Sequence, residues 1–562
     1  MFKPTYLVRI ALLVILSSTL AYAQRPLSKP TETGGPLIPE QAAFDVQTYD
    51  VSIKVDPATK SITGTTVMTA KVIHPTDTII LNLDTPYAID RVFGQGGNKQ
   101  VGLKYERDGG KIKIRFPETK KVGETFETII SYGGTPRVAP NPPWVGGFIW
   151  TKTPSGADWV SIAMQNDGAD VLFPVKDHPS DKPETATLRV TVPDPLVAVG
   201  PGVLDETVKN ENGTSTYVWK VSNPIPNYSI LFDAAPYRVI KDTTKSITGE
   251  NIPIEFYILP ESYDKGPKLI AETKKYNAFY EKYLGPFPWR AEKLGIVETP
   301  HRGMEHSTHI AYGNKFRFEP DGLDWLMLHE FGHEWWANLV TARDWNDFWI
   351  HEGFQSFMDT LYVEETKGKE AYFAAMKGRA RGTRNMQPVA PRGEKFAYEV
   401  YLQAPDYTKG DGDIYGKGAV VLHTLRYLIG DDAFFRSLRR MAYPRKEMES
   451  YTDGRQQRLT DTDEFLKIAQ EESKMKLDWF FELYLRQPKL PTLKLGISTS
   501  DCNLDLQWET PNNMPFPMPV DVVLKGGKVQ RVEMKNGKAR VCVDYNGKEP
   551  VIDPNGWVLK AP

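Results

Sequence analysis

Two histidines one helical turn apart are the clearest candidates for chemistry in this chain. His329 and His333 enclose Glu330 in the run HEFGH at 329–333. On a helix, positions i and i+4 share one face, so both imidazoles can reach a single metal ion. The pattern predicts a zinc site on a helix over residues 326–337. The alternative is an ordinary helix with two histidines and a solvated Glu330.

A third ligand is expected from a second helix. A hydrolytic zinc site needs three protein ligands and one open position for water. Glu352 follows His333 after 18 intervening residues, enough to end one helix and return another against it. A carboxylate among the apolar neighbours of Glu352 is costly to bury unless it is paired or bound to a metal. We therefore predict His329, His333 and Glu352 as ligands of one zinc ion, with a surface-pointing Glu352 as the alternative.

Glu330 and Asp359 have predicted roles around this ion. Glu330 directly follows His329, so its carboxylate can touch a metal-bound water without binding the metal. Zinc lowers the pKa of that water towards 7, and Glu330 can take its proton and pass it to a leaving amine. We expect hydrolysis of a carbonyl compound, namely a peptide bond. Asp359, two turns after Glu352, either orients a ligating imidazole or is a surface residue.

Together these residues resemble the gluzincin zinc metallopeptidases of the aminopeptidase N and leukotriene hydrolase type. The resemblance covers residues from about 40 to about 490 and rests on five stretches of sequence. These are HEFGH with its later glutamate, the segment 333–341, GMEH at 303–306, DIYGKGA at 413–419, and residues 165–180.

The resemblance implies further roles. Tyr415 would donate its hydroxyl to the oxyanion of the tetrahedral intermediate. Glu305 and Gln165, beside Gly303 and Met304, would bind the substrate and its free α-ammonium. With the α-ammonium bound by Glu305 at a fixed distance from zinc, only the first peptide bond lies at the metal. The resemblance therefore implies an exopeptidase. From the residues alone, Tyr415 would be a packed tyrosine, Glu305 a strand-edge acid and Gln165 a loop amide.

Two histidines depart from the family pattern. His306 stands where the family has asparagine after Met-Glu, and His351 where it has asparagine before the glutamate ligand. We expect His306 to reshape the amine pocket or to loosen the exopeptidase preference. His301, His306 and His309 could form a second metal site, with pocket walls or hydrogen-bonded structure as the alternative.

The elements that must position these residues change character along the chain. Alternation of apolar and polar residues predicts strands, and helical periodicity predicts helices. Strands are predicted at 49–55, 61–72, 187–192, 216–221, 228–232 and 539–544, and helices at 267–283, 419–428 and 462–484. We predict a multidomain α+β protein with a mostly antiparallel β domain at 39–240, a mostly helical zinc catalytic domain at 241–490 and a small β domain at 491–562. The resemblance implies a β-saddle, a thermolysin-like domain and a β-sandwich for these three.

The amino terminus reads as a secretory signal over residues 1–23. Lys3 and Arg9 flank a short apolar run, and an A-x-A cleavage site ends at Ala23. Residues 24–38, rich in Pro, Gly, Ser and Thr, are predicted to be a flexible leader. We expect a soluble periplasmic or extracellular protein, with an uncleaved membrane anchor as the alternative. In that compartment Cys502 and Cys542 could pair, or remain two thiols.

Composition excludes several other classes of protein. The 562 residues are 40% hydrophobic and 25% charged, with a net charge of −2. So many apolar residues exclude a mainly disordered protein. The balanced charge provides no overall positive potential to bind the phosphate backbone of a nucleic acid. Two cysteines exclude a disulfide scaffold and a four-thiolate zinc module.

The leading hypothesis is a secreted aminopeptidase with one zinc ion that acts on peptides. One alternative is a zinc hydrolase of the same fold that cleaves internal peptide bonds or an epoxide. Another is a catalytically silent scaffold, which the presence of all the zinc and catalytic residues argues against. Long family members carry a further helical domain for which this chain has no room, so we expect a more open cleft.

Overall fold

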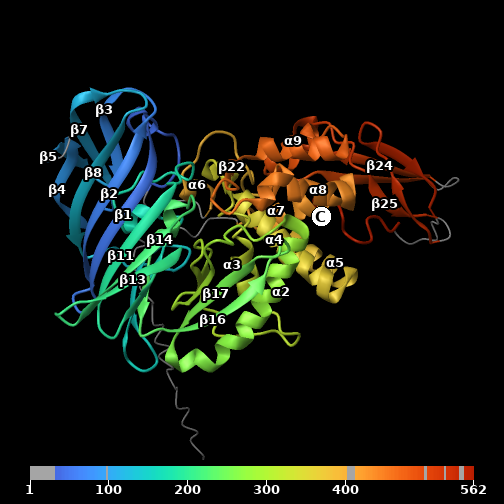
Figure 1. Cartoon of the computed structure of the whole chain (residues 1–562). Coiled ribbons are helices and arrows are strands. Elements are labelled where there is room, and N and C mark those ends of the chain that lie inside the picture. The colour runs from blue at the N-terminus through green and yellow to red at the C-terminus, as the bar shows by residue number, and fades with distance from the viewer. Residues whose placement is uncertain (1–31, 97–98, 402–411, 499–502, 525–526, 544–549) are drawn as a thin grey trace, which may run out of the picture.

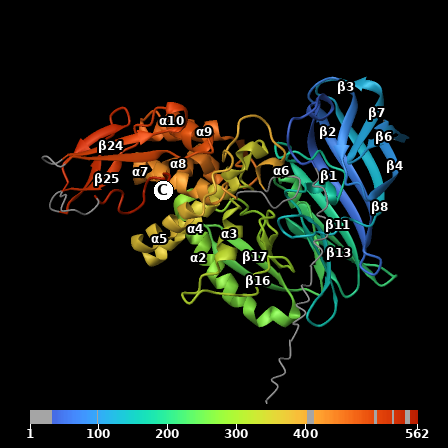
Figure 2. The same ribbon diagram turned by 180° about the vertical axis from the view of Figure 1, so that it is seen from behind.

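The computed structural model describes residues 32–562 except 97–98, 402–411, 499–502, 525–526 and 544–549. Its elements form three regions in chain order, with the helical region between the amino-terminal sheets and the carboxy-terminal strands (Figure 1). The view from behind shows the same order (Figure 2). The predicted signal peptide lies outside the described residues. The three-part α+β architecture predicted from the pattern is confirmed.

The amino-terminal region is built on an eight-stranded sheet in the order β13-β14-β11-β1-β2-β8-β4-β5. All of its strand pairs are antiparallel except β1 with β11. The strands are β1 (Phe44–Asp56), β2 (Ser61–Val72), β4 (Tyr87–Gly96), β5 (Lys99–Gly102), β8 (Thr125–Gly134), β11 (Thr185–Pro193), β13 (Val203–Lys209) and β14 (Thr214–Val221). Two smaller sheets join β12 (Val197–Val199), β15 (Asp233–Ala235), β10 (Asp158–Ala163) and β9 (Gly147–Lys152), and β3 (Thr76–Asn82), β7 (Lys111–Lys120) and β6 (Lys104–Asp108). The short helix α1 (Pro39–Ala42) precedes β1.

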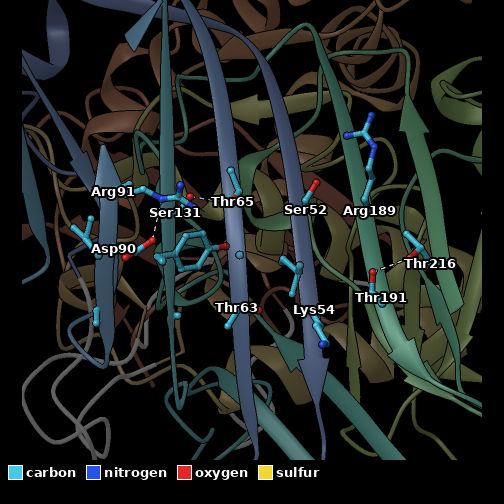
Figure 3. Close-up of a pocket in the computed structure, with 16 residues that line it drawn as sticks. Ser52, Lys54, Thr63, Thr65, Asp90, Arg91, Ser131, Arg189, Thr191 and Thr216 are labelled. Atoms are coloured by element: carbon cyan, nitrogen blue, oxygen red, sulfur yellow. Dashed lines mark hydrogen bonds and ion pairs between the residues drawn. The ribbon is translucent and has the colours of Figure 1, made fainter. Parts of the chain in front are cut away.

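One face of the main sheet is polar and hollowed. Figure 3 shows short hydroxyl side chains from neighbouring strands pointing from this face, including the bonded pairs Thr65 with Ser131 at 3.1 Å and Thr191 with Thr216 at 2.8 Å. The hollow has a volume of about 750 Å³. On β1, Ser52 alternates with buried Val51, which faces the core. This is the period-two division between a solvated and a packed face in an antiparallel sheet.

The middle region combines one mixed sheet with nine helices among its described residues. The sheet order is β16-β17-β18-β20-β19, so the short strand β19 lies at an edge. Its strands are β16 (Arg238–Lys245), β17 (Asn251–Ile258), β18 (Leu294–Glu298), β19 (Gly303–Met304) and β20 (Ile310–Tyr312). The helices are α2 (Gly266–Leu284), α3 (Trp325–Gly332), α4 (Trp349–Lys367), α5 (Lys369–Arg381), α6 (Ala397–Val400), α7 (Gly416–Ile429), α8 (Asp431–Ala442), α9 (Thr462–Ser473) and α10 (Asp478–Leu485). The strands β21 (Val340–Ala342) and β22 (Arg458–Thr460) pair in parallel.

The carboxy-terminal region consists of two small sheets in the part that the structure describes. One joins β23 (Thr492–Ser498), β24 (Asn503–Glu509) and β27 (Lys538–Val541), and the other joins β25 (Val520–Val523) and β26 (Val529–Val532). Cys502 lies outside the described residues, so its pairing with Cys542 stays a prediction. Within the described part of the chain, no helix has the length and apolar character needed to cross a bilayer.

Two local predictions were wrong. The helix predicted over 326–337 ends at Gly332; beyond it the N–H groups of residues 338, 339 and 340 bond to carbonyls five residues back, and Ala337 has φ 148°. Residues 227–229 form a 3₁₀ turn instead of opening a strand at 228, because Tyr228 is turned towards the site described below. The predicted leader at 24–38 lies partly outside the described residues; in its described part, the N–H of Gly34 bonds to the carbonyl of Asp177 at 3.1 Å.

The close crossing of α4 and α7 controls the geometry that follows. Gly353 on α4 faces Gly418 on α7, and a Cβ built on Gly418 would lie 2.8 Å from the Cα of Gly353. The absence of side chains at both positions lets the two backbones touch. Glu352 adjoins one glycine and Tyr415 precedes the other by three residues. Helix contact at this point therefore sets the distance between a predicted ligand and a predicted catalytic group.

We predict that Gly418→Ala lowers the free energy of unfolding by about 1–3 kcal/mol, because the added methyl group meets backbone that cannot move aside. The matched control is Gly378→Ala on α5, where a Cβ meets nothing within 4 Å. Thermal and chemical denaturation of both variants measure the effect. Equal stability of the two variants would contradict the close crossing.

Candidate metal centre and active site

The helix α3 holds the two predicted histidine ligands in place from its amino terminus. Asp324 caps it by accepting a hydrogen bond from the N–H of Met327 at 3.1 Å. The hydroxyl of Tyr312 donates to the other carboxylate oxygen of Asp324 at 2.6 Å and ties the cap to β20. Such a cap satisfies an N–H that would otherwise be unpaired and typically stabilises a helix by about 1 kcal/mol. The direction of α3, and with it the aim of both imidazoles, is therefore set by the neighbouring sheet.

The three predicted zinc ligands converge on one point. His329 Nε2 and His333 Nε2 are 3.3 Å apart, and Glu352 Oε2 lies 3.6 Å from the first and 3.5 Å from the second. Tetrahedral ligands at zinc bond lengths near 2.1 Å are separated by about 3.4 Å. Glu352 Oε2 is buried and accepts no hydrogen bond from any residue that the structure describes. Two imidazole nitrogens and one carboxylate oxygen at this spacing fit a zinc ion.

The other imidazole nitrogens support this assignment. His333 Nδ1 lies 2.8 Å from the carbonyl oxygen of Trp336, to which it can only donate, so its Nε2 carries the lone pair. His329 Nδ1 lies 2.9 Å from Asp359 Oδ2. Asp359 is held in turn by Gln355 at 3.0 Å and by Arg379 at 3.5 Å. Of the two sequence-based alternatives for Asp359, the geometry therefore supports the one in which it orients a ligating imidazole.

Glu330, on α3, lines the same cavity and lies against Gly303 of β19. A Cβ at Gly303 would lie 2.7 Å from Glu330 Oε1, so only glycine leaves room for this carboxylate. Burial, opposed by His329 and reinforced by Glu352, raises the pKa of Glu330 to about 8 in the metal-free site. A divalent cation beside it would lower that pKa again. With such a cation bound, Glu330 is ionised and can act as a proton acceptor at the edge of the ligand set.

Glu305 forms the second part of the site. It is buried, and its Oε1 accepts hydrogen bonds from Gln165 Nε2 and, at 3.3 Å, from the Tyr228 hydroxyl. With its Nε2 so used, Gln165 retains a carbonyl oxygen as an acceptor for an ammonium group. The structure thus brings together Glu305 and Gln165 from different regions, although Gln165 had the weakest sequence signal.

Glu305, Glu330 and His333 also offer ligand atoms that all lie within 4.8 Å of one another. We assign the metal to the set with Glu352, because Glu305 already accepts two hydrogen bonds whereas Glu352 Oε2 accepts none among the described residues. Burial, and then the charges of Glu352 and Glu330, raise the pKa of Glu305 well above its usual value. The negative charges of Glu305, Glu330 and Glu352 stabilise cations. The site can therefore bind a metal ion and a positively charged group of a ligand at the same time.

Tyr415 caps the cavity from the start of α7. Its ring stacks on His329 with centroids 6.3 Å apart, and its hydroxyl lies 2.8 Å from that of Tyr401. Burial raises the pKa of Tyr415 well above its usual value, so the phenol stays protonated and can donate. Tyr401 was missed from the sequence, because nothing in the spacing of one among 26 tyrosines marks it.

The two departures from the family pattern do not enter the cavity. His306 Nε2 lies 3.2 Å from the carbonyl oxygen of Met164, which directly precedes Gln165, so His306 contacts the backbone beside the predicted amine-binding residue. His351 Nε2 accepts from the N–H of Ala342 at 3.0 Å. His309 pairs with Asp233 at 2.7 Å. Among the described residues, the groups of three potential metal ligands both contain His333, so the predicted second site at 301–309 is not supported.

The cavity over these groups measures about 290 Å³. Its lining is Pro143, Trp144, Gln165, Arg302, Gly303, Met304, Glu305, Trp325, Leu326, His329, Glu330, His333, Glu352, Tyr401 and Tyr415. Gly303 and Met304 thus lie where the resemblance implied. The sequence analysis did not predict Trp144, Arg302 and Trp325. The position of Arg302 directly before Gly303 is a signal that could have indicated it.

We predict that Asp359→Asn weakens zinc binding about 10- to 100-fold, because the amide cannot hold the imidazole of His329 as the carboxylate does. Competition with a chelator measures this affinity without any substrate. The matched control is Glu365→Gln on the exposed side of the same helix, where Glu365 pairs with Lys282. An unchanged affinity in Asp359→Asn would remove Asp359 from the metal site.

Comparison with known proteins agrees with this geometry in both regions. Residues 268–484 match the peptidase family M1 domain, and residues 46–229 match the peptidase M1 N-terminal domain. Together the two matches cover more than two thirds of the chain. The ligands, Glu330, Glu305 and Tyr415 lie in the first match and Gln165 in the second.

Similar curated proteins include leucine aminopeptidase 2 of Vanderwaltozyma polyspora and human endoplasmic reticulum aminopeptidase 1. The first is 26% identical over 307 residues, which are 53% of this chain and 44% of that protein. The second is 24% identical over 411 residues, or 69% of this chain and 42% of that protein. The chain thus spans less than half the length of these two relatives.

Among solved structures, an M1 zinc metallopeptidase from Deinococcus radiodurans has a similar fold. Its TM-score is 0.61 at 22% identity, covering 80% of this chain and 95% of that one. The sequence resemblance to metallopeptidases of the aminopeptidase N type is confirmed. The chain belongs to peptidase family M1.

Proposed function

We propose that this protein is an exported zinc-dependent aminopeptidase that removes single residues from the free amino end of peptides. One observation carries the proposal: the acceptor atoms of Glu305, Glu330 and His333 lie within 4.8 Å of one another. The α-nitrogen of an amino acid is only about 2.5 Å from its own carbonyl carbon. An ammonium held by Glu305 therefore leaves the first carbonyl, and not a later one, beside Glu330 and the metal ligands.

The edge strand β19 supports this orientation of the substrate. It carries Gly303 and Met304, pairs only with β20 in the described sheet, and borders the cavity. An unpaired strand edge offers N–H and C=O groups to an extended peptide. A substrate along β19 would meet Glu305 with its amino group and Glu330 with its first peptide bond.

Proton transfer falls to Glu330. A zinc ion held by His329, His333 and Glu352 would supply a Lewis acid that polarises the scissile carbonyl and acidifies water. One oxygen of Glu330 accepts the proton of the attacking water and then delivers it to the nitrogen of the leaving amine. Exclusion of bulk water from the buried carboxylate strengthens these interactions.

Tyr415 stabilises the charge that develops on the carbonyl oxygen. Its hydroxyl stays protonated, and Tyr415 lines the cavity from the start of α7. If Tyr401 donates to the oxygen of Tyr415, the proton of Tyr415 remains free for the substrate, and the chain of hydrogen bonds strengthens both. Tyr401 is thus a positioning residue for Tyr415.

The two alternative functions receive less support. An endopeptidase needs room beyond the position of the substrate amine, but Glu305, Gln165 and Tyr228 are joined there by hydrogen bonds. An epoxide hydrolase would not need an anion at that position. A silent scaffold would not need three ligand atoms at tetrahedral spacing. The names of the relatives, which are aminopeptidases, support the same choice.

Export to the periplasm or the cell exterior is proposed from residues 1–23 alone. They combine basic residues, a short apolar run and an A-x-A site. Detection of the mature amino terminus at Gln24 would support this part of the proposal.

We predict that the zinc-loaded protein cleaves an unblocked peptide and leaves its N-acetylated form intact, because acetylation removes the charge that Glu305 binds. Glu330→Gln should lower kcat by about 10²–10⁴-fold, since an amide accepts no proton. Mass spectrometry of the products measures both effects. Equal cleavage of the two peptides would replace the aminopeptidase with an endopeptidase, and cleavage of neither would overturn both.

We predict that Tyr415→Phe lowers kcat by about 10²–10³-fold with little change in KM, because its hydroxyl acts on charge that exists only in the transition state. Tyr401→Phe should lower kcat by a smaller factor in the same direction. Steady-state kinetics on one peptide compares the two variants. A normal kcat in Tyr415→Phe would remove the tyrosine from the reaction.

A further inference from the structure

Arg302 lies in the active-site cavity without an assigned role. It is exposed, directly precedes β19, and lines the cavity. Its guanidinium carbon lies 4.6 Å from the centroid of the Trp325 ring. Within the described part of the chain, Arg302 has no carboxylate within 4.0 Å of its nitrogens. A cation is thus held at a fixed place by an aromatic face and left without an ion-pair partner.

Arg302 also stands apart from the other charges of the cavity. It is the only lysine or arginine among the described residues that line it, where Glu305, Glu330 and Glu352 are the carboxylates. Arg302 is close enough to Glu330 to lower its pKa. The three carboxylates favour a metal ion and an ammonium group. Arg302, the one cation beside them among the described lining residues, is placed to bind a negatively charged group instead.

The order of residues along β19 says where that group would lie. Glu305 is at one end, Gly303 adjoins Glu330, and Arg302 is beyond it. Arg302 and Glu305 flank β19, and at about 3.3 Å per residue their backbones are at most about 10 Å apart. A peptide with its amino group at Glu305 and its first peptide bond at Glu330 continues towards Arg302. Arg302 is therefore on the side of the leaving group.

The length of the substrate follows from this spacing. Extended peptides span at most about 3.6 Å per residue, so a dipeptide covers about 7 Å and a tripeptide about 11 Å. The flexible side chain of Arg302 can reach the terminal carboxylate of either a dipeptide or a tripeptide. A planar guanidinium binds a carboxylate through two parallel hydrogen bonds, which gives orientation as well as affinity.

We propose that Arg302, braced by Trp325, is a specificity-determining residue that binds a carboxylate on the leaving side of the cleaved bond. The group is the terminal carboxylate of a dipeptide or tripeptide, or an acidic side chain at the second residue. This inference rests on the proposed aminopeptidase function and narrows its substrate class to short or acidic peptides. Trp325 keeps the guanidinium over the cavity, so less freedom is lost when the carboxylate binds.

The test compares Leu-Gly with Leu-Gly-amide, and Leu-Asp-amide with Leu-Asn-amide, on the zinc-loaded enzyme. We expect the carboxylate member of at least one pair to have a kcat/KM about tenfold higher, mostly through KM, because binding to Arg302 is the same before and in the transition state. In Arg302→Gln this ratio should fall towards one, and Arg302→Lys should keep part of it. Each ratio cancels any general effect of the variant on Glu330 or on folding.

The matched control is Lys315→Gln, which removes a positive charge from an exposed position outside the cavity and should keep the wild-type ratios. The first pair identifies a terminal carboxylate and the second an acidic side chain. Wild-type ratios near one for both pairs, or ratios that persist in Arg302→Gln, would overturn the role of Arg302 while leaving the aminopeptidase intact. Failure of the wild type to cleave any of the four peptides would instead reject the proposed function and this inference with it.

Discussion

Three potential ligand atoms, two imidazole nitrogens and one carboxylate oxygen, held within 3.6 Å of one another are the constraint on which the candidate site depends. Buried lone pairs at that distance repel one another, so the surrounding protein must hold them together until a cation binds. Asp359 and the carbonyl of Trp336 fix the two imidazoles, and the cap at Asp324 fixes the helix that carries them. The same requirement explains why α3 stops at Gly332, since a continued helix would not bring the Trp336 carbonyl beneath His333.

Glycines supply the room that this convergence needs. A side chain at Gly303 would collide with Glu330, one at Gly332 with Gln355 and Tyr280, and one at Gly418 with the backbone of Gly353. At each position the neighbour is a catalytic group, a residue that supports Asp359, or the helix bearing Glu352. The close approaches that these glycines permit therefore also set the positions of the charged groups in the site.

The amino-terminal region contributes a side chain to the candidate site. Gln165 donates to Glu305, while the buried ammonium of Lys182 donates to the carbonyl of Asn338 at 2.7 Å. Asn338 donates in turn to the carbonyl of Glu305 at 2.9 Å. The proposed recognition of a substrate amine at Glu305 thus depends on contacts between two regions that lie far apart in the sequence.

The sequence by itself predicted the candidate metal ligands and the candidate general base, and it determined the division into sheet, helical and small β regions, because these follow from local spacing and periodicity. The family resemblance added Tyr415, Glu305 and Gln165, whose roles no local pattern reveals. Only the tertiary structure decided that Gln165 meets Glu305, that His306 and His351 turn away from the cavity, and that Tyr401 joins Tyr415. Only the structure also placed Arg302 over Trp325. Each of these depends on which distant side chains share a small volume, and hydrophobic periodicity specifies the buried face of an element but not the partner that packs against it.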